Sequence, residues 1–299
     1  MKKFILKVGL FFLALIIVDR ALGTIFAYMG DHAKGGYMGH HKYATDKANE
    51  DILIFGSSRA IHHYNPQILS DSLGMSCYNC GVDGNGIILF YGLWQMIKKH
   101  HKPKMIVYDI SLSFDFCKGE SNQKYLGWLR ADYDRPGVKE IFAVIDPTEK
   151  YKMMSWLYRY NSKFLQNVTD YIHPIFGIEG NGYLPLKGEM DTMKIKKANG
   201  DNRQITLDEQ KIYYLKKLIE ETRGDSVKLV FAVSPSWYGE AQVQPIVDFF
   251  NNENAVFIDF SNKEKYTRHT EYFKDGQHLN SFGADEYTKD IIQYLRQYQ

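Results

Sequence analysis

Short, predominantly apolar runs alternate along the chain with segments of helical pattern. Apolar runs of about five to seven residues are typical of strands buried on both faces of a parallel sheet. Such runs cover residues 52–56, 75–80, 105–110, 227–233 and 255–260, and the last four contain one or two polar residues each. Helices are predicted by the spacing and apolar content of the segments 66–73, 87–101, 206–223 and 281–297.

This alternation predicts an α/β fold with three layers, in which helices cover a flavodoxin-like parallel sheet of about five strands. The stretch from about 111 to 205 does not follow the alternation and is rich in Tyr, Trp and Met. We interpret it as a helical insertion after strand three, within a domain of residues 51–299. It is expected to lie over one end of the sheet and to shape the site rather than form a separate domain.

The first residues have the pattern of an export signal. Three lysines (Lys2, Lys3 and Lys7) precede 11 uncharged residues, Val8–Val18, and the pair Asp19-Arg20 follows. A basic segment before an apolar one is typical of a secretory signal. Because apolar residues resume after Arg20, we predict an uncleaved signal anchor over 1–29, although 21–23 could be a cleavage site. The polar, glycine-rich residues 30–50 predict a linker or lid, and the protein is expected to be exported and held at a membrane.

Composition excludes some classes of function. The 299 residues are 44% hydrophobic and 15% aromatic, which is enough for a core and argues against disorder. The formal net charge is only +2, without a basic stripe, so nucleic-acid binding is disfavoured. No Cys/His spacing typical of zinc sites occurs, and neither a metal nor another cofactor is expected.

A candidate nucleophile and its partners lie at opposite ends of the predicted domain. Ser58 belongs to the string GSSRA after the first apolar run, and Asp275 and His278 belong to FKDGQHLNSFGADEY. A serine at the carboxyl end of a parallel strand lies where open α/β sheets bind ligands. It needs a base to accept its proton and a carboxylate to orient that base. Alternatively, Ser58 only caps a helix, and Asp275 and His278 form an inert pair.

These motifs resemble the SGNH (GDSL-like) hydrolase family, especially its divergent exported branch of polysaccharide O-acyltransferases and esterases and the D-alanine-transfer protein of teichoic acid synthesis. The family's Gly-Asp-Ser block matches Gly56-Ser57-Ser58, with Ser57 in place of the Asp. Its Asp-x-x-His block matches Asp275 and His278. The resemblance implies that Ser58 is the nucleophile, His278 the base and Asp275 the residue that orients it.

The resemblance also implies an oxyanion hole. The family's Asn-x-Gly-x-x-Gly block matches residues 79–84, and its later glycine, here Gly84, would give a backbone N–H to the oxyanion. The third family block carries an Asn whose side chain completes the hole. This chain has no Asn there, and Ser113 lies nearest to that position, with Ser111 in place of the block's glycine.

The expected function is that of an exported serine esterase or O-acyltransferase that acts on an acylated carbohydrate or cell-envelope substrate. A membrane protein that donates acyl groups is a possible partner. The missing Asn keeps open an alternative, a non-catalytic module of this fold that binds a glycan or a partner protein at the membrane.

Four further positions are close to the motifs. Arg59 is expected either to bind an anionic group of the substrate or to hold its loop by a salt bridge. Trp237 and Tyr238 follow the fourth predicted strand and could stack on a sugar ring, or only pack. His62 and His63, shortly after Ser58, are expected to be solvated.

Overall fold

The computed structural model describes residues 1–119, 121–191, 206–239 and 243–299, which form two compact units. One unit combines Met1–Lys42 with Asn122–Gly177, and the other combines Tyr43–Ser121 with Ile178–Gln299. This division differs from the predicted single domain over 51–299, because residues 122–177 group with the N-terminal segment. The second unit contains every predicted site residue.

A parallel sheet is the centre of the second unit. Within the described residues its strands follow the order β2-β1-β3-β4-β5, and every neighbouring pair is parallel. The strands are β1 (Ile52–Gly56), β2 (Cys77–Asn79), β3 (Met105–Asp109), β4 (Lys228–Val233) and β5 (Val256–Asp259). This is the flavodoxin-like strand order, which confirms the predicted fold class. In it the carboxyl ends of β1 and β3 are neighbours, with Gly56 in register with Asp109.

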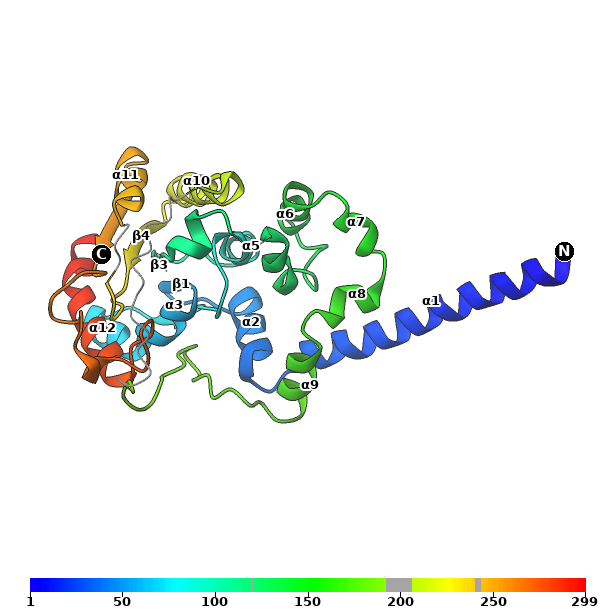
Figure 1. Cartoon of the computed structure of the whole chain (residues 1–299), viewed down its shortest axis with the longest axis horizontal. Coiled ribbons are helices and arrows are strands. Elements are labelled where there is room, and N and C mark those ends of the chain that lie inside the picture. Colours follow the sequence, from blue (N-terminus) through cyan, green and yellow to red (C-terminus); the bar gives the residue numbers. More distant parts are fainter. Residues whose placement is uncertain (120, 192–205, 240–242) are drawn as a thin grey trace. The chain divides into compact units, whose positions relative to one another are not determined.

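Helices cover both faces of this sheet (Figure 1). The longer ones are α3 (Ser58–His63), α4 (Pro66–Leu73), α5 (Ile87–Ile97), α10 (Glu209–Gly224), α11 (Gln244–Asn252) and α12 (Ser281–Leu295). The short ones are the π-helix η1 (Leu112–Phe116) and the 3-10 helices η4 (Thr270–Tyr272) and η5 (Arg296–Tyr298). Helix α12 packs on α3 and α4, whereas α10 packs on α5.

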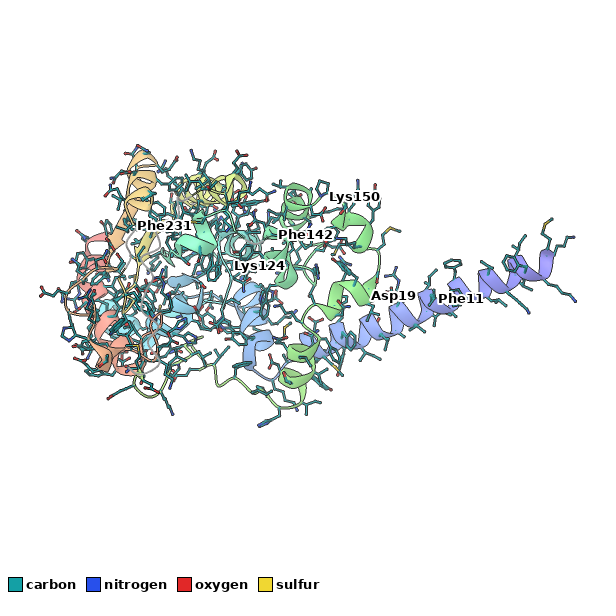
Figure 2. The ribbon with its side chains drawn as sticks, viewed as in Figure 1. Phe11, Asp19, Lys124, Phe142, Lys150 and Phe231 are labelled. Carbon is teal, nitrogen blue, oxygen red and sulfur yellow. The ribbon has the colours of Figure 1, made fainter. Side chains whose placement is uncertain are left out.

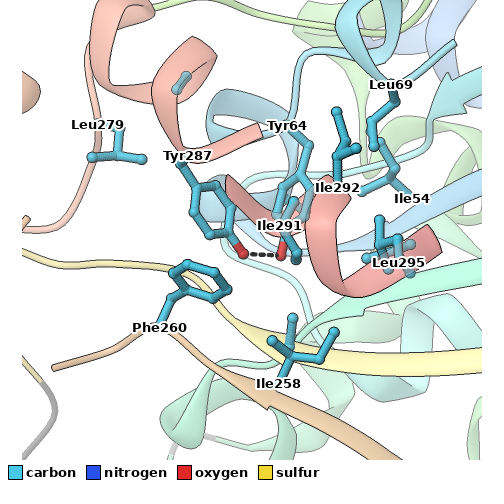
Figure 3. Close-up of a cluster of buried hydrophobic side chains, with 14 of the residues drawn as sticks. Ile54, Tyr64, Leu69, Ile258, Phe260, Leu279, Tyr287, Ile291, Ile292 and Leu295 are labelled. Carbon is cyan, nitrogen blue, oxygen red and sulfur yellow. Dashed lines mark hydrogen bonds between the residues drawn. The ribbon is translucent and has the colours of Figure 1, made fainter. Parts of the chain in front are cut away.

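Alternate strand residues face opposite layers, as the pleat of a strand requires. One set, which includes Ile54 and Ile258, packs with Tyr287 and Ile291 of α12 (Figure 3). The other face is aromatic. Phe55 stacks on Phe90 of α5 at 5.7 Å between ring centroids, and Phe231 stacks on Phe250 of α11 at 4.2 Å.

Two tyrosine hydroxyls carry a hydrogen-bond chain through this core. The Tyr64 hydroxyl donates to the buried carboxylate of Asp109 at 2.7 Å and lies 2.9 Å from the Tyr287 hydroxyl (Figure 3). Because Tyr64 donates to Asp109, Tyr287 must donate to Tyr64. The chain therefore connects α12 to the carboxyl end of β3.

The first unit is helical. Its elements are α1 (Lys2–Asp31), α2 (Gly36–Asp46), which begins in this unit, η2 (Asn122–Trp128), α6 (Val138–Ile145), α7 (Glu149–Lys152), α8 (Trp156–Asn161) and α9 (Phe164–Ile172). The predicted linker over 30–50 is thus largely helical. Its helix begins beside Asp170 of α9, whose carboxylate accepts the Met38 N–H at 2.9 Å.

Asp19, a charged residue inside the predicted anchor, holds the start of α8 in place. The Asp19 carboxylate accepts hydrogen bonds from the Ser155 hydroxyl and from the Trp156 and Leu157 N–H groups at 2.9 and 3.1 Å. These are first-turn N–H groups, which have no acceptor within their own helix. Burial opposes ionisation of Asp19, but these hydrogen bonds outweigh it and lower the pKa of its carboxyl.

The N-terminal half of α1 exposes large apolar side chains. Phe11 stands away from the helix with 60% of its surface exposed (Figure 2), and Phe4 and Ile16 are similarly exposed. Among the helices that the structure describes, none meets the length and hydropathy that a membrane-crossing helix needs.

The tyrosine chain predicts unequal effects on stability. Tyr64→Phe removes a donor to a buried carboxylate and should lower the free energy of unfolding by about 2–3 kcal/mol. Tyr287→Phe removes only a bond between two hydroxyls and should cost about 1 kcal/mol. Urea unfolding of both variants measures this order, and an equal or smaller loss in Tyr64→Phe would contradict it.

Candidate active site

Ser58 lies at the turn between β1 and α3. The chain leaves β1 at Gly56, whose φ is +134° and whose missing Cβ would lie 2.5 Å from the Asp109 carbonyl oxygen. Only glycine tolerates both the backbone angle and the close approach. Ser57 is the N-cap residue and Ser58 the first residue of α3, so the Ser58 N–H has no acceptor within the helix.

The loop before α12 brings His278 to this serine. His278 Nε2 lies 2.8 Å from Ser58 Oγ, and His278 Nδ1 lies 3.0 Å from both carboxylate oxygens of Asp275. Asp275 Oδ1 also accepts the N–H groups of Gln277 and His278, at 2.8 and 2.9 Å. The structure therefore brings together the serine, histidine and aspartate that the sequence singled out.

The electrostatics of this group favour an ionised Asp275. Partial burial opposes ionisation, but hydrogen bonds from the His278 ring and the Gln277 N–H outweigh it and lower the pKa of Asp275 to about 2. An ionised Asp275 keeps the proton of His278 on Nδ1, which leaves Nε2 free to accept the Ser58 proton. Such an arrangement can generate a serine alkoxide as an acyl group is attacked.

Gly84 follows β2 in a tight turn. Its φ of +67° is in the left-handed region that favours glycine, and the space beside it is open. Among the described residues no acceptor takes its N–H. Gly84 can therefore present a backbone donor to a ligand.

The third block forms the π-helix η1. Ser113 is exposed there, and its hydroxyl lies 3.2 Å from that of Ser111. Lys211 of α10, whose side chain is fully buried, donates from Nζ to the carbonyl oxygens of Ser113 and Cys117 at 2.9 and 2.6 Å. This bridge holds the backbone around Ser113 to α10.

Asp115 is the buried acid of the same segment. It accepts the Tyr108 hydroxyl and the N–H groups of Ile87 and Ser111 at 2.7–2.8 Å. Burial raises the pKa of Asp115 to about 6, although these three donors act in the opposite direction. Asp115 thereby connects the third block to the start of α5.

Arg59 is occupied by the protein itself. Its guanidinium donates to the carbonyl oxygens of Ile110 (2.5 Å) and Ser234 (3.4 Å), and Nε lies 3.5 Å from Asp109 Oδ1. Of the two roles expected for Arg59, this geometry matches the salt bridge that holds the loop after β1, and not the binding of a substrate anion.

Trp237 and Tyr238 pack against the loop that carries Asp275 and His278. The backbone N–H of Trp237 donates to the Gly276 carbonyl oxygen at 3.3 Å, and the indole ring of Trp237 packs against the core. A Cβ on Gly276 would come within 2.3 Å of the Tyr238 ring. Both rings are partly buried. Of the two roles expected for Trp237 and Tyr238, the contacts described here match packing and not the stacking of a sugar.

The expectation that His62 and His63 are solvated is wrong, because a neighbouring segment covers α3. Residues 179–186, here called the strap, bond to α3 through the Leu184 N–H and the Ile61 carbonyl oxygen, at 3.1 Å. His62 Nδ1 lies 2.6 Å from the Leu184 carbonyl oxygen. Both rings are consequently buried.

His63 connects two loops of the site. Its Nε2 accepts the N–H of Leu279, the residue after His278, at 2.9 Å, and its Nδ1 lies 2.8 Å from Ser234 Oγ. Nδ1 must therefore carry the proton and donate to Ser234. Burial is the main cause that lowers the pKa of His63 well below its ordinary value, so the ring stays neutral.

Sequence reasoning missed Asp109, Ser234, His63 and Lys211. Asp109 ends β3 and would have been detectable as an acid at the carboxyl end of a buried strand. The other three act through contacts with segments far away in the chain, and no local pattern marks them.

No family model matches this chain, and no curated protein matches it. Solved structures to which it is similar include the acetyl xylan esterase AlAXEase (12% identity, TM-score 0.40), with 82% of this chain and 99% of that one covered. A catalytic mutant of the acetylxylan esterase Axe2 from Geobacillus stearothermophilus is 13% identical (TM-score 0.41, 85% and 96% covered). The lipase/acylhydrolase from Enterococcus faecalis is 11% identical (TM-score 0.37, 82% and 95% covered).

Asp115 predicts a specific pH dependence of stability. Its pKa of about 6 exceeds that of an unfolded aspartate, so the folded protein binds this proton more tightly. Its contribution to stability is present below about pH 4 and is lost as the pH rises through about 6, a change on the order of 3 kcal/mol.

Asp115→Asn should remove this dependence. The difference in unfolding free energy between the parent and the variant should shrink by that amount from pH 4 to pH 7. Chemical denaturation at both pH values measures it, and a constant difference would show that Asp115 titrates normally.

Proposed function

We propose that this protein is a serine esterase or O-acyltransferase that acts on an acylated carbohydrate or cell-envelope substrate. The observation that carries the proposal is the Ser58 Oγ to His278 Nε2 distance of 2.8 Å, with Asp275 bound to the other ring nitrogen. The carbohydrate part of the proposal is supported by the resemblance of the motifs to polysaccharide-modifying proteins.

In the first half of the reaction, Ser58 Oγ attacks the ester carbonyl while its proton passes to His278 Nε2. The charge that develops on the carbonyl oxygen is stabilised by the N–H groups of Ser58 and Gly84, and fixed donors of this kind are worth about 3 kcal/mol each. The Ser113 hydroxyl is proposed as a third donor in place of the family's Asn. His278 then protonates the leaving alcohol, and an acyl-enzyme on Ser58 remains.

In the second half, water or a sugar hydroxyl loses a proton to His278 and attacks the acyl-enzyme. Water gives the free acid, and a sugar hydroxyl gives a new ester. Ser58 recovers its proton from His278 in both cases. Ionised Asp275 stabilises the imidazolium that forms in each half-reaction.

One feature of the third block favours a second candidate, a non-catalytic module that binds a glycan or an acyl-donor membrane protein. The family's Asn is absent from η1, and loss of an oxyanion donor can cost a hundredfold or more in rate. Reaction of Ser58 with a fluorophosphonate separates the candidates, because only an activated serine reacts quickly.

We further propose that the protein works outside the cytoplasm, with the exposed apolar half of α1 in contact with a membrane. Lys2, Lys3 and Lys7 before the apolar residues 8–18 support export. Two contacts support the retention of residues 1–23 in the mature protein. Gly23 packs on the Trp156 backbone, and Asp19 caps α8. Cleavage after residue 23 would remove both contacts.

Substitution at the two adjacent serines tests the nucleophile. Ser58→Ala should lower kcat for 4-nitrophenyl acetate by at least about a thousandfold and abolish fluorophosphonate labelling. Ser57→Ala is the matched control. Ser57 Oγ is buried and has no hydrogen-bond partner among the described residues, so this variant should keep most of the activity. Equal losses in both variants, or a loss only in Ser57→Ala, would refute the assignment.

Fractionation tests the location. The full chain should sediment with membranes, whereas Phe11→Asp combined with Ile16→Asp should release it, because burying these charges in lipid is costly. Esterase activity of the released variant should equal that of the parent. A mature protein that begins near Thr24 by mass spectrometry, or membrane binding that survives the two substitutions, would contradict the proposal.

A further inference from the structure

We propose that His63 is a positioning residue for the reaction, because its imidazole fixes the peptide between His278 and Leu279 relative to Ser58. The inference rests on the proposed function, since it concerns how His278 is held as the base. His63 ends α3, the helix that begins with Ser58. Its ring is fully buried and lies 6.3 Å from the His278 ring between centroids, so it acts through the backbone and not on the substrate.

Both peptide groups that flank His278 are held by hydrogen bonds. The N–H of His278 itself donates to Asp275 Oδ1 at 2.9 Å. In the next peptide, the His278 carbonyl oxygen accepts the Lys274 N–H at 2.8 Å, and the Leu279 N–H donates to His63 Nε2 at 2.9 Å. Asp275 and Lys274 belong to the same loop as His278, whereas His63 belongs to the helix of the nucleophile. The bond from Leu279 to His63 therefore sets where the loop lies relative to the nucleophile.

The other nitrogen of the His63 ring is fixed as well. Because the Leu279 N–H can only donate, Nε2 accepts and Nδ1 carries the proton. Nδ1 donates to Ser234 Oγ at 2.8 Å, and the Ser234 N–H donates to the buried carboxylate of Asp109 at 3.1 Å. The imidazole is thus a rigid spacer between the end of β4 and the loop that carries the base.

The His63 ring must remain neutral for this bond to persist. Burial lowers the pKa of His63 well below its ordinary value, and the His278, Arg59 and His62 side chains act in the same direction. A proton that moves to His278 during the reaction opposes protonation of His63 still further, because like charges repel. The bond from Leu279 therefore persists in both protonation states of His278.

Two amide substitutions at His63 test the inference in the full-length protein. The His63→Gln amide reaches the place of Nε2, so its carbonyl oxygen can still accept the Leu279 N–H. The His63→Asn amide reaches only the place of Nδ1, so it can still donate to Ser234 but leaves the Leu279 N–H unpaired. His63→Asn should lower kcat for 4-nitrophenyl acetate about 10- to 100-fold with little change in KM, because a small displacement of the base is costly in rate. His63→Gln should stay within about fivefold of the parent.

Two measurements separate positioning from a general loss of structure. Each variant loses the ring and one hydrogen bond, so the midpoints of urea unfolding should fall by similar amounts, and each variant is the control for the other. NMR of the nitrogen-labelled parent in detergent supplies a readout that does not need activity. It should show a spin coupling between the Leu279 nitrogen and His63 Nε2, which only an N–H···N hydrogen bond transmits.

The outcomes separate this inference from the proposed function. A parent that has no esterase activity and does not react with a fluorophosphonate refutes the proposed function, and the role of His63 with it. An active parent in which His63→Gln loses as much kcat as His63→Asn refutes the inference alone, and so does an active parent without the spin coupling. If His63→Asn does not fold, His63→Gln decides by itself, because a folded His63→Gln that loses more than about tenfold in kcat overturns the role of the acceptor.

Discussion

The need to satisfy one buried carboxylate organises the carboxyl end of the sheet, where the candidate site lies. Asp109 ends β3 with almost no exposed surface and takes hydrogen bonds from the Tyr64 hydroxyl and the Ser234 N–H, with Arg59 as its counter-ion. Burial raises the pKa of Asp109, against the effect of these partners. Removing any one of these three partners would leave a buried, poorly paired carboxylate, which would destabilise the fold. Helix α3 and the end of β4 are therefore held in one geometry, and Ser58, next to Arg59, shares it.

The serine and the histidine reach each other through the same network. Ser234 binds Asp109 by its N–H and His63 by its hydroxyl, and His63 in turn accepts the N–H of Leu279, next to His278. The segments that carry Ser58 and His278 are thus joined by direct polar contacts beneath the site. The side chains proposed to perform the chemistry, Ser58 and His278, are partly exposed, whereas the groups that position them are buried. This arrangement of exposed side chains on buried supporting groups is typical of sites whose geometry is set before the substrate arrives.

The sequence was informative wherever local pattern reports local environment. Buried strands such as Ile52–Gly56 appear as apolar runs, and Ser58, Asp275 and His278 belong to short motifs that form turns at strand and helix ends. It was uninformative where a role depends on distant contacts. His62 and His63 read as polar residues of a surface helix, because the strap that covers them begins more than a hundred residues later. Asp19 read as an interruption of an apolar segment, whereas its carboxylate binds Ser155, 136 residues away. The family blocks indicate the position of Ser113, but only the folded chain brings Lys211, 98 residues away, to the Ser113 carbonyl oxygen.

The discontinuous first unit has a consequence for biosynthesis. Residues 1–42 pack with residues 122–177, so α1 emerges from the ribosome long before α8 and α9, against which its second half packs. During that interval the carboxylate of Asp19 and the backbone of Gly23 lack the contacts with Ser155 and Trp156 that they make in the folded unit. Translation of the intervening residues 43–121, which carry β1, β2 and β3, delays closure of the helical unit. The order of the segments thus leaves a period in which the whole of α1 is accessible to targeting factors, and folding of the unit then covers only its second half.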